Sequence, residues 1–316
     1  MSHSVIDQGN GIFTIDTGYQ RSGLVASHLI KQDDEVAFVD VGAGSNIQTV
    51  YDMMQAHGID FDQVRYVMVT HVHLDHAGAA GLLMQKCPQA QLVVHPNGAN
   101  HMIDPSKLIA GATAVYGEEV FKSTFGEVIP VDATRVIEAP DGMSLTLAGR
   151  QLSFLDTPGH ARHHYCVYDE RSQGFFSGDT FGLSYRELDV DGQPFIFPTT
   201  TPVQFDPDAL HASIDRMMAM QPQLMFLTHF GCVSGLDKLA DDMHELIDAF
   251  VQLALQADPD DRFQSIKQNM GALLLERLCQ HGCSMTSEQL LSFIDLDLEL
   301  NSQGLEVWLD RQAKNK

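Results

Sequence analysis

The chain has 316 residues, 44% of them hydrophobic, and its 19 Lys and Arg against 42 Asp and Glu give a formal charge of −23. This charge argues against a nucleic-acid binder, which needs clustered basic side chains, and against a binder of anionic membrane surfaces. The apolar content argues against a disordered chain, and no apolar run approaches the roughly 18 residues of a membrane span.

Strand and helix signals alternate before residue 235. Short β-rich segments at 11–16, 24–31 and 35–41 predict a meander, and a helix capped by Ser45 follows at 45–57. Buried strands are predicted at 64–69 and 92–95, and residues 99–126 are mostly helical. A second β-rich part then contains strands at 134–138, 143–147, 151–155, 165–168, 174–177 and 224–227, the last preceded by a helix that Asp206 caps.

The pattern becomes wholly helical beyond Gly235. Four segments at 236–257, 262–280, 286–293 and from there to about 312 carry apolar residues at helical spacing. We therefore expect two domains, a mixed one over residues 1–235 and a C-terminal α-helical extension over 236–316. The extension is expected to pack on the first domain, with a lid or a homodimer contact as the alternatives.

Cysteine usage and the N-terminus indicate the compartment. An odd and scattered set of cysteines does not resemble a disulfide framework, and the set consists of Cys87, Cys166, Cys232, Cys279 and Cys283. The first residues, Met1–Asp7, lack the basic and apolar regions of a signal peptide. We therefore expect reduced thiols and a cytoplasmic protein.

A cluster of metal-ligand residues, His71-Val72-His73-Leu74-Asp75-His76, follows the predicted strand at 64–69. Neutral imidazole and carboxylate suit zinc, iron or manganese, whereas a solvated His-rich loop is the plain alternative. Three more strands end in a ligand-type residue, within TPGH at 157–160, SGDT at 177–180 and THFG at 228–231. Because ligand sites gather at strand carboxyl ends, these residues are expected to converge. Five His and two Asp exceed the needs of one tetrahedral ion and suit two ions that share a carboxylate.

These four ordered motifs, together with VDVG at 39–42, resemble those of the metallo-β-lactamase-fold superfamily over about residues 10–235. The resemblance implies an α+β fold, a four-layer αββα sandwich with metals at one edge of the paired sheets, so that residues 1–235 are its catalytic domain. It also implies the ligands: His71, His73 and His160 for the first metal, Asp75, His76 and His229 for the second, and Asp179 as the bridge. Asp40 would orient a ligand through a hydrogen bond, although a turn-forming role is the alternative.

Departures from the family pattern narrow the expected branch. Asp179 stands where one β-lactamase group has a cysteine ligand, which favours the branch similar to glyoxalase II and the lactonases. His73 stands where the oxygen-reducing diiron members have a carboxylate, which favours hydrolysis. The residues after Asp179, TFGLSYREL, lack the Arg-containing pattern expected for glyoxalase II, which argues against a glutathione thioester.

The implied activity is that of a dinuclear metal-dependent hydrolase. Two divalent ions, zinc first and iron or manganese otherwise, would lower the pKa of a shared water, and the bridging hydroxide would cleave a small ester-type bond. Asp75 would hold this hydroxide and carry its proton, Tyr185 would reach the substrate oxyanion, and His164 would lie beside the ligands or simply pack. The aromatic residues at 181–205 would form a pocket wall or ordinary packing. A lactone or carboxylic ester is favoured.

Several other activities stay open at this point. A thioesterase or a phosphoesterase of the same fold is one alternative, and a persulfide dioxygenase-like oxidoreductase with a single iron is another. The charge of −23 argues against a nuclease, and the full ligand set argues against a non-catalytic binder. The expected partner is a small-molecule substrate, with no nucleic acid and no membrane.

Overall fold

The computed structural model describes residues 5–200 and 203–314, so that Met1–Ser4, part of the segment without signal-peptide features, lies outside the described residues. The chain forms two compact units. Unit 1 comprises Met1–Asp156, His163–Gly178 and Pro222–Ser234, and unit 2 comprises Thr157–Arg162, Asp179–Gln221 and Gly235–Lys316. These units follow spatial packing rather than chain order. Unit 2 therefore joins the helical extension to two earlier segments, and the domain boundary at residue 235 stays a prediction.

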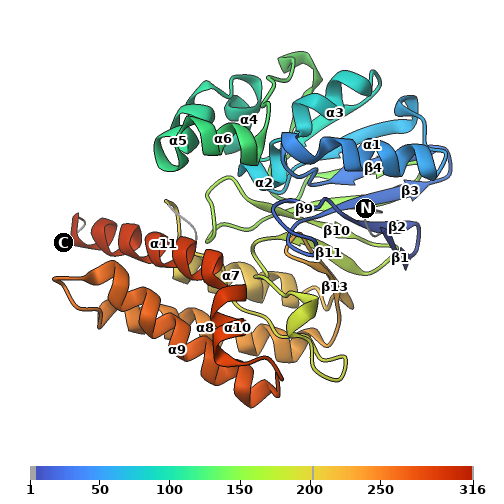
Figure 1. The fold of residues 1–316 in the computed structure, drawn as a ribbon. Coiled ribbons are helices and arrows are strands. Elements are labelled where there is room, and N and C mark those ends of the chain that lie inside the picture. The colour runs from blue at the N-terminus through green and yellow to red at the C-terminus, as the bar shows by residue number, and fades with distance from the viewer. Residues whose placement is uncertain (1–4, 201–202, 315–316) are drawn as a thin grey trace. The chain divides into compact units, whose positions relative to one another are not determined.

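Unit 1 contains two mixed β-sheets (Figure 1). The described strands of the first sheet run in chain order as β1 (Val5–Gly9), β2 (Ile12–Asp16), β3 (Ala26–Gln32), β4 (Glu35–Val39), β5 (Val64–Met68), β6 (Gln91–Val94) and β7 (Val136–Glu138). Pairing is antiparallel from β1 to β4 and parallel from β4 to β7. The second sheet has the order β13 (Gly231–Val233), β12 (Leu224–Leu227), β11 (Gly174–Gly178), β10 (Tyr165–Asp169), β9 (Arg150–Asp156) and β8 (Ser144–Leu147), of which only β11 and β12 pair in parallel.

Alternating side chains along the strands build two apolar cores, because successive residues of a strand point to opposite faces. Val39 of β4 packs with Phe154 of β9 and Phe226 of β12 in the core shared by the two sheets. Its neighbour Phe38 packs on the opposite face with Val50, in the core that the helices cover. Unit 1 therefore has three layers, a helical layer and two sheets.

The helices of unit 1 all come from crossovers of the first sheet. They are α1 (Ile47–Ala56), α2 (Leu74–Ala77), α3 (Ala80–Lys86), α4 (Pro96–Ile103), α5 (Ser106–Tyr116) and α6 (Glu118–Phe125). The start of α1 differs from the prediction, because Asn46 rather than Ser45 is its N-cap residue. The Ser45 hydroxyl instead donates to the Thr124 carbonyl at 2.7 Å, a partner 79 residues away that the local capping pattern could not reveal.

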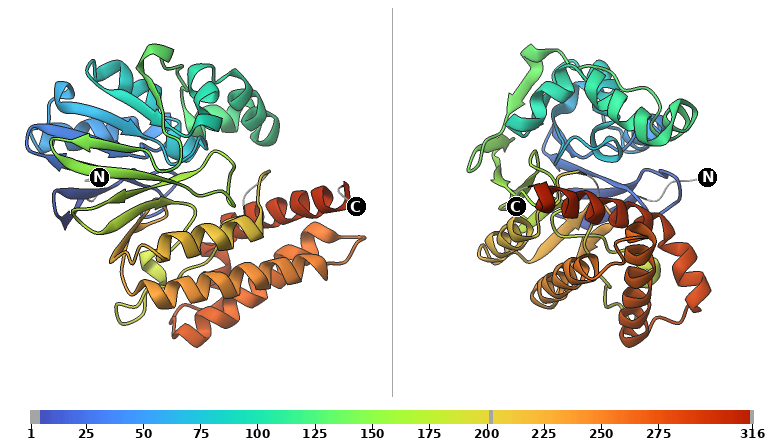
Figure 2. Two further views of the ribbon diagram at one scale, coloured as in Figure 1. Left: turned by 180° about the vertical axis from the view of Figure 1, so that it is seen from behind. Right: turned by 90° about the vertical axis from the view of Figure 1, so that its left-hand side faces the viewer.

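Unit 2 contains the four helices that the sequence predicts beyond Gly235, together with the helix that Asp206 caps. Its helices are α7 (Pro207–Met218), α8 (Leu236–Leu255), α9 (Arg262–His281), α10 (Ser287–Phe293) and α11 (Asp295–Lys314). Asp206 caps α7, since its carboxylate accepts from the Ala209 N–H at 3.2 Å. Helices α8, α9 and α11 lie side by side (Figure 2). No described helix is long and apolar enough to cross a membrane.

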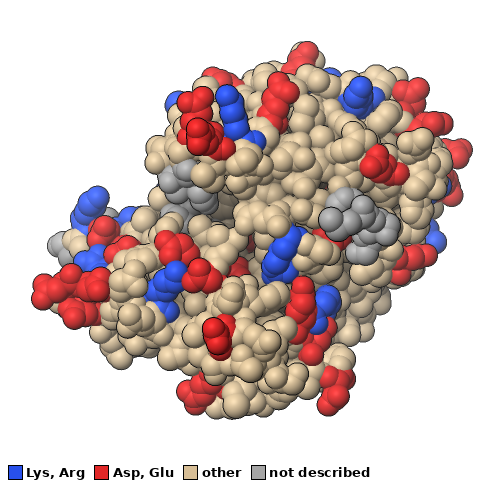
Figure 3. All heavy atoms as spheres, in the orientation of Figure 1, with Lys and Arg blue, Asp and Glu red and all other residues tan. Residues whose placement is uncertain are grey.

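The α+β sandwich and the C-terminal helical region are thus confirmed. Acidic side chains are interspersed with Lys and Arg over the face of the molecule in Figure 3. On this face the acidic side chains are therefore not collected in one block.

Candidate metal centre

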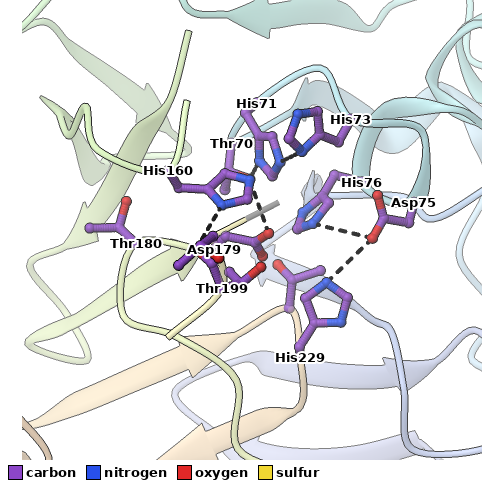
Figure 4. A network of polar contacts seen from close by, with 12 residues as sticks. Thr70, His71, His73, Asp75, His76, His160, Asp179, Thr180, Thr199 and His229 are labelled. Atoms are coloured by element: carbon purple, nitrogen blue, oxygen red, sulfur yellow. Dashed lines mark hydrogen bonds and ion pairs between the residues drawn. The ribbon is translucent and has the colours of Figure 1, made fainter. Parts of the chain in front are cut away.

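The segment from Thr70 to His76 turns sharply between β5 and α2. The short helix α2 begins at Leu74, and the N–H groups of His76 and Ala77 both donate to the His73 carbonyl. Within this turn His71 Nε2 lies 2.8 Å from His73 Nδ1, and the two rings meet edge to face at 4.4 Å (Figure 4). The alternation of ligand-type residues across the turn therefore directs two imidazole nitrogens to one place.

A second group lies wholly within unit 1 and consists of Asp75, His76 and His229. Each residue offers one ligand atom, and these atoms lie within 4.8 Å of one another. Asp75 Oδ2 is 3.7 Å from His76 Nε2 and 3.4 Å from His229 Nε2. Figure 4 shows the three side chains pointing toward one another, with His229 brought in from the turn after β12. The sequence prediction that Asp75, His76 and His229 lie together agrees with this geometry.

Hydrogen bonds fix the tautomers of both histidines in this group. His76 Nδ1 lies 2.7 Å from Asp40 Oδ2, and His229 Nδ1 lies 2.8 Å from the Leu24 carbonyl oxygen. Since a carboxylate and a carbonyl only accept, each Nδ1 carries the proton and each neutral ring presents its Nε2 lone pair. Two lone pairs and a carboxylate oxygen thus converge, which is the donor set that a divalent cation requires.

The carboxylate of Asp40 lies behind this group and accepts hydrogen bonds from several of its supporting residues. Asp40 is fully buried and adopts a positive φ of 52°, directly after β4. Besides His76, its carboxylate accepts from the Thr70 N–H at 2.8 Å, the Thr70 hydroxyl at 2.9 Å and the Thr228 hydroxyl at 2.6 Å. These bonds hold the turns that carry His71 and His229 as well as the ring of His76. The predicted orienting role of Asp40 matches the contacts expected behind a metal ligand.

Unit 2 contains two further candidate ligands, His160 and Asp179, which lie beside each other. His160 Nε2 lies 3.3 Å from Asp179 Oδ2, and His160 Nδ1 lies 3.4 Å from the Thr199 carbonyl oxygen (Figure 4). The carbonyl again places the proton on Nδ1 and leaves the Nε2 lone pair facing a carboxylate. The pair therefore repeats the pattern found at His76 and His229.

Gly159 sets the position of His160. Its φ is +136°, and a Cβ at this residue would lie 2.4 Å from the Leu210 Cα. The Gly159 carbonyl accepts from the Asp206 N–H at 2.7 Å, and the Pro158 carbonyl accepts from the Ser213 hydroxyl at 2.6 Å. The TPGH turn is thus pressed against α7, where only glycine fits.

The candidate ligands fit a divalent ion by their chemistry. Among the described residues, Asp75, His76 and His229 form a group within unit 1 that is able to hold a metal, and the other candidate donors are His71 and His73 in unit 1 and His160 and Asp179 in unit 2. All are imidazoles or carboxylates, and most are buried. A nitrogen and oxygen donor set without thiolate suits zinc, iron or manganese. It does not select one metal among these.

The structure gives His164 and Tyr185 different surroundings. His164 is fully buried, and its ring stacks on His71 at 4.9 Å, so it lies beside a candidate ligand. Tyr185 is also buried, but its hydroxyl donates to Asp297 Oδ1 at 2.9 Å, on helix α11 of unit 2. The Tyr185 hydroxyl thus has a protein partner, and its contact with a substrate oxyanion stays a prediction; the reaction proposed below does not use it.

The aromatic residues at 181–205 are predicted to form either a pocket wall or ordinary packing. The structure describes residues 181–205 except for 201–202. All the aromatic side chains of this segment are buried in unit 2. Phe197 packs edge to face with Tyr185 at 6.0 Å, and Phe205 packs edge to face with Trp308 at 6.4 Å. This segment therefore packs as ordinary core, the plainer of the two interpretations.

Sequence reasoning missed the threonines that support the centre. Thr70 and Thr228 donate to Asp40, and the Thr199 carbonyl accepts from His160. A signal for two of them was available, because a threonine precedes the ligand in both THVH at 70–73 and THFG at 228–231. Thr199 carries no such signal, since any residue offers a carbonyl.

Known proteins share both the sequence and the fold. The chain is 28% identical over 207 residues to the metallo-beta-lactamase fold-containing protein ST1585 of Sulfurisphaera tokodaii, covering 63% of this chain and 75% of that protein. It is 28% identical to the acyl-coenzyme A thioesterase MBLAC2 of Gallus gallus, covering 59% of this chain and 68% of that protein. The solved structure of ST1585 aligns with a TM-score of 0.65 at 22% identity, over 94% of this chain and 98% of the other.

A second solved structure agrees in fold. The metallo-beta-lactamase family protein TTHA1429 of Thermus thermophilus aligns with a TM-score of 0.65 at 19% identity, over 92% of this chain and 89% of the other. The sequence model of the Metallo-beta-lactamase superfamily matches residues 21–229, a range that contains every candidate ligand. The chain therefore belongs to the metallo-beta-lactamase superfamily, whose enzymes are generally metal-dependent hydrolases.

Proposed function

We propose that the chain is a dinuclear metal-dependent hydrolase that cleaves an acyl thioester. His71, His73 and His160 would hold one ion, Asp75, His76 and His229 the other, and Asp179 would contact both. The order of the motifs supports this assignment, since it follows the superfamily pattern over residues 21–229. The observation that carries the proposal is the convergence of His76 Nε2, His229 Nε2 and Asp75 Oδ2. The hydrogen bonds at Nδ1 of the two histidines leave their Nε2 lone pairs available to a cation.

Bound divalent ions would supply Lewis acidity, lowering the pKa of water and polarising the acyl carbonyl. The protein holds the ligands in place through Asp40 and through the turns that it anchors. Asp75 has access to solvent, because its side chain is 26% exposed, whereas those of His76 and Asp40 are fully buried. Its carboxylate is therefore placed to take up a proton from water and deliver it to the leaving group.

The thioester assignment is supported by the similarity to MBLAC2, named an acyl-coenzyme A thioesterase. The net charge of −23 disfavours coenzyme A esters as substrates, because a negative protein repels polyanions. We therefore expect a thioester with a small neutral thiol to be cleaved with a higher kcat/KM than the coenzyme A thioester of the same acyl group. Added salt would narrow this difference, since it screens charges beyond about 10 Å at 0.1 M.

A panel with one acyl group on different leaving groups tests the proposal. The panel contains a neutral thioester, the coenzyme A thioester, an oxoester, a lactone of equal carbon number and a phosphodiester. Hydrolysis should stop after chelation of metals and return with zinc, iron or manganese, and the Asp75→Asn variant should lower kcat. Asp241 is an exposed carboxylate on α8, and Asp241→Asn is the matched control, which should keep both the wild-type kcat and the dependence of hydrolysis on metal.

Two results would refute different parts of the proposal. Faster cleavage of the phosphodiester than of every acyl substrate would overturn the substrate class. Undiminished hydrolysis after complete metal removal would overturn the metal-dependent mechanism itself.

The oxoester or lactone is the second candidate. The feature that favours it is Asp179, which matches the lactonase-like branch at the bridging position. Cleavage of the oxoester or lactone with a higher kcat/KM than both thioesters would select this candidate. The metal ligands proposed above would be the same.

A further inference from the structure

Two helices of unit 2 carry the same short pattern of histidine and aspartate. Helix α7 contains His211 and Asp215, and helix α8 contains His244 and Asp248. In each helix the two residues are four apart, which places them on one face. None of these four residues is a candidate ligand of the metal centre.

The side chains pair crosswise between the helices. His211 Nε2 lies 3.2 Å from Asp248 Oδ1, and His244 Nε2 lies 3.2 Å from Asp215 Oδ1. The two Nδ1 atoms lie 2.6 Å from each other, and the rings are stacked at 4.9 Å with an interplanar angle of 11°. The four groups thus form a chain, carboxylate–imidazole–imidazole–carboxylate, with the two Nδ1 atoms at its middle.

The geometry of this chain suits a cation at its centre. A carboxylate only accepts hydrogen bonds, so the bond from His211 Nε2 to Asp248 places a proton on that nitrogen and leaves Nδ1 as the metal-binding atom when it carries no proton. Asp215 lies at ion-pair distance from His244 Nε2 and favours the same arrangement there. Two lone pairs at 2.6 Å repel each other unless a proton or a metal ion lies between them. A carboxylate behind each imidazole is also the arrangement that orients histidine ligands in metal sites.

We propose that His211 and His244 bind a divalent transition-metal ion through their Nδ1 atoms, with Asp215 and Asp248 as positioning residues. Imidazole suits Zn²⁺, Ni²⁺ and Cu²⁺. The two rings are partly exposed, at 24% and 28%, so the ion can enter and water can fill its remaining positions. Two nitrogens about 2.0–2.1 Å from a tetrahedral ion lie about 3.3 Å apart, so binding needs an opening of less than about 1 Å.

Metal counting on the full chain tests this site. The wild type and the His211→Gln/His244→Gln double variant are loaded with Zn²⁺, freed of excess ion and analysed for metal per chain. The wild type should retain one more equivalent than the double variant, and His57→Gln, an exposed histidine of unit 1, should match the wild type. With Cu²⁺, the difference between the electron paramagnetic resonance spectra of wild type and double variant should show nitrogen ligands.

The carboxylates provide a second measurement that does not remove a ligand. Asp215→Asn or Asp248→Asn should weaken binding at this site by about 10–100-fold, whereas Asp241→Asn on the same helix α8 should not. These variants also serve if the double variant fails to fold, which circular dichroism would show.

Equal metal content and equal affinity in the wild type, the double variant and the Asp→Asn variants would overturn the proposal. The shared cation would then be a proton. Either result leaves the proposed hydrolase untouched, because none of these four residues belongs to its ligand set.

Discussion

Replacing Asp40 by asparagine tests how the protein sets the tautomer of a ligand. Oδ2 of Asp40 receives bonds from the Thr70 and Thr228 hydroxyls and from His76 Nδ1, while Oδ1 receives the Thr70 N–H at 2.8 Å. An asparagine that keeps its oxygen at the Thr70 N–H must direct its amide N–H groups at His76 and Thr228. The imidazole then accepts at Nδ1, its proton moves to Nε2, and the lone pair for the metal is lost.

The expected magnitude follows from this geometry. Loss of a partner behind a metal ligand weakens metal binding by about 10–100-fold, which corresponds to about 1.4–2.7 kcal/mol. The lost charged hydrogen bond also lowers the free energy of unfolding by about 1.5–3 kcal/mol. Asp40→Asn should therefore remain folded but bind more weakly the ion held by Asp75, His76 and His229.

The assay is a titration of the metal-free chain with Zn²⁺ against a chromophoric chelator, together with a thermal melt. Asp16→Asn is the matched control, because Asp16 is equally buried and accepts from Gly18, Ser22 and Gly23 without contacting a candidate ligand. It should lose stability and keep its metal affinity. If Asp40→Asn binds metal as tightly as the wild type, the argument from the His76 tautomer is wrong.

Two further predictions concern buried groups on either side of the unit division. Burial lowers the pKa of His28 from 6.5 to about 4. The unfolded chain therefore takes up a proton at higher pH than the folded chain, and stability falls as the pH drops from 6.5 toward 4. Between pH 7.5 and 4.5 this contribution is about 2–3 kcal/mol, and urea unfolding of His28→Asn should show a pH dependence reduced by that amount. Tyr185→Phe should destabilise the protein by about 1–3 kcal/mol through the loss of the bond to Asp297, with kcat/KM for the preferred acyl substrate unchanged. A large fall in kcat with unchanged melting temperature would instead return Tyr185 to the reaction.

Local sequence determined much of the fold. Consecutive apolar residues such as Phe38 and Val39 indicate a strand that is buried on both faces. The Asp206-Pro207 pair indicates the start of α7. Strands β1 and β13 were not predicted. Strand β13 has only three residues and no residue of β1 is buried, so their pairing with β12 and β2 rather than their own pattern defines them.

The chain alone determined which residues are candidate ligands, because a histidine or aspartate that directly follows a strand is recognisable without coordinates. Only the tertiary structure decided how these residues are supported and what their neighbours do. Asp40 reaches Thr228 across 188 residues, Tyr185 reaches Asp297 across 112, and His211 meets His244 across 33. A residue's type and local pattern state what it is able to bind, whereas its hydrogen-bond partner depends on packing between distant segments, which local sequence does not encode.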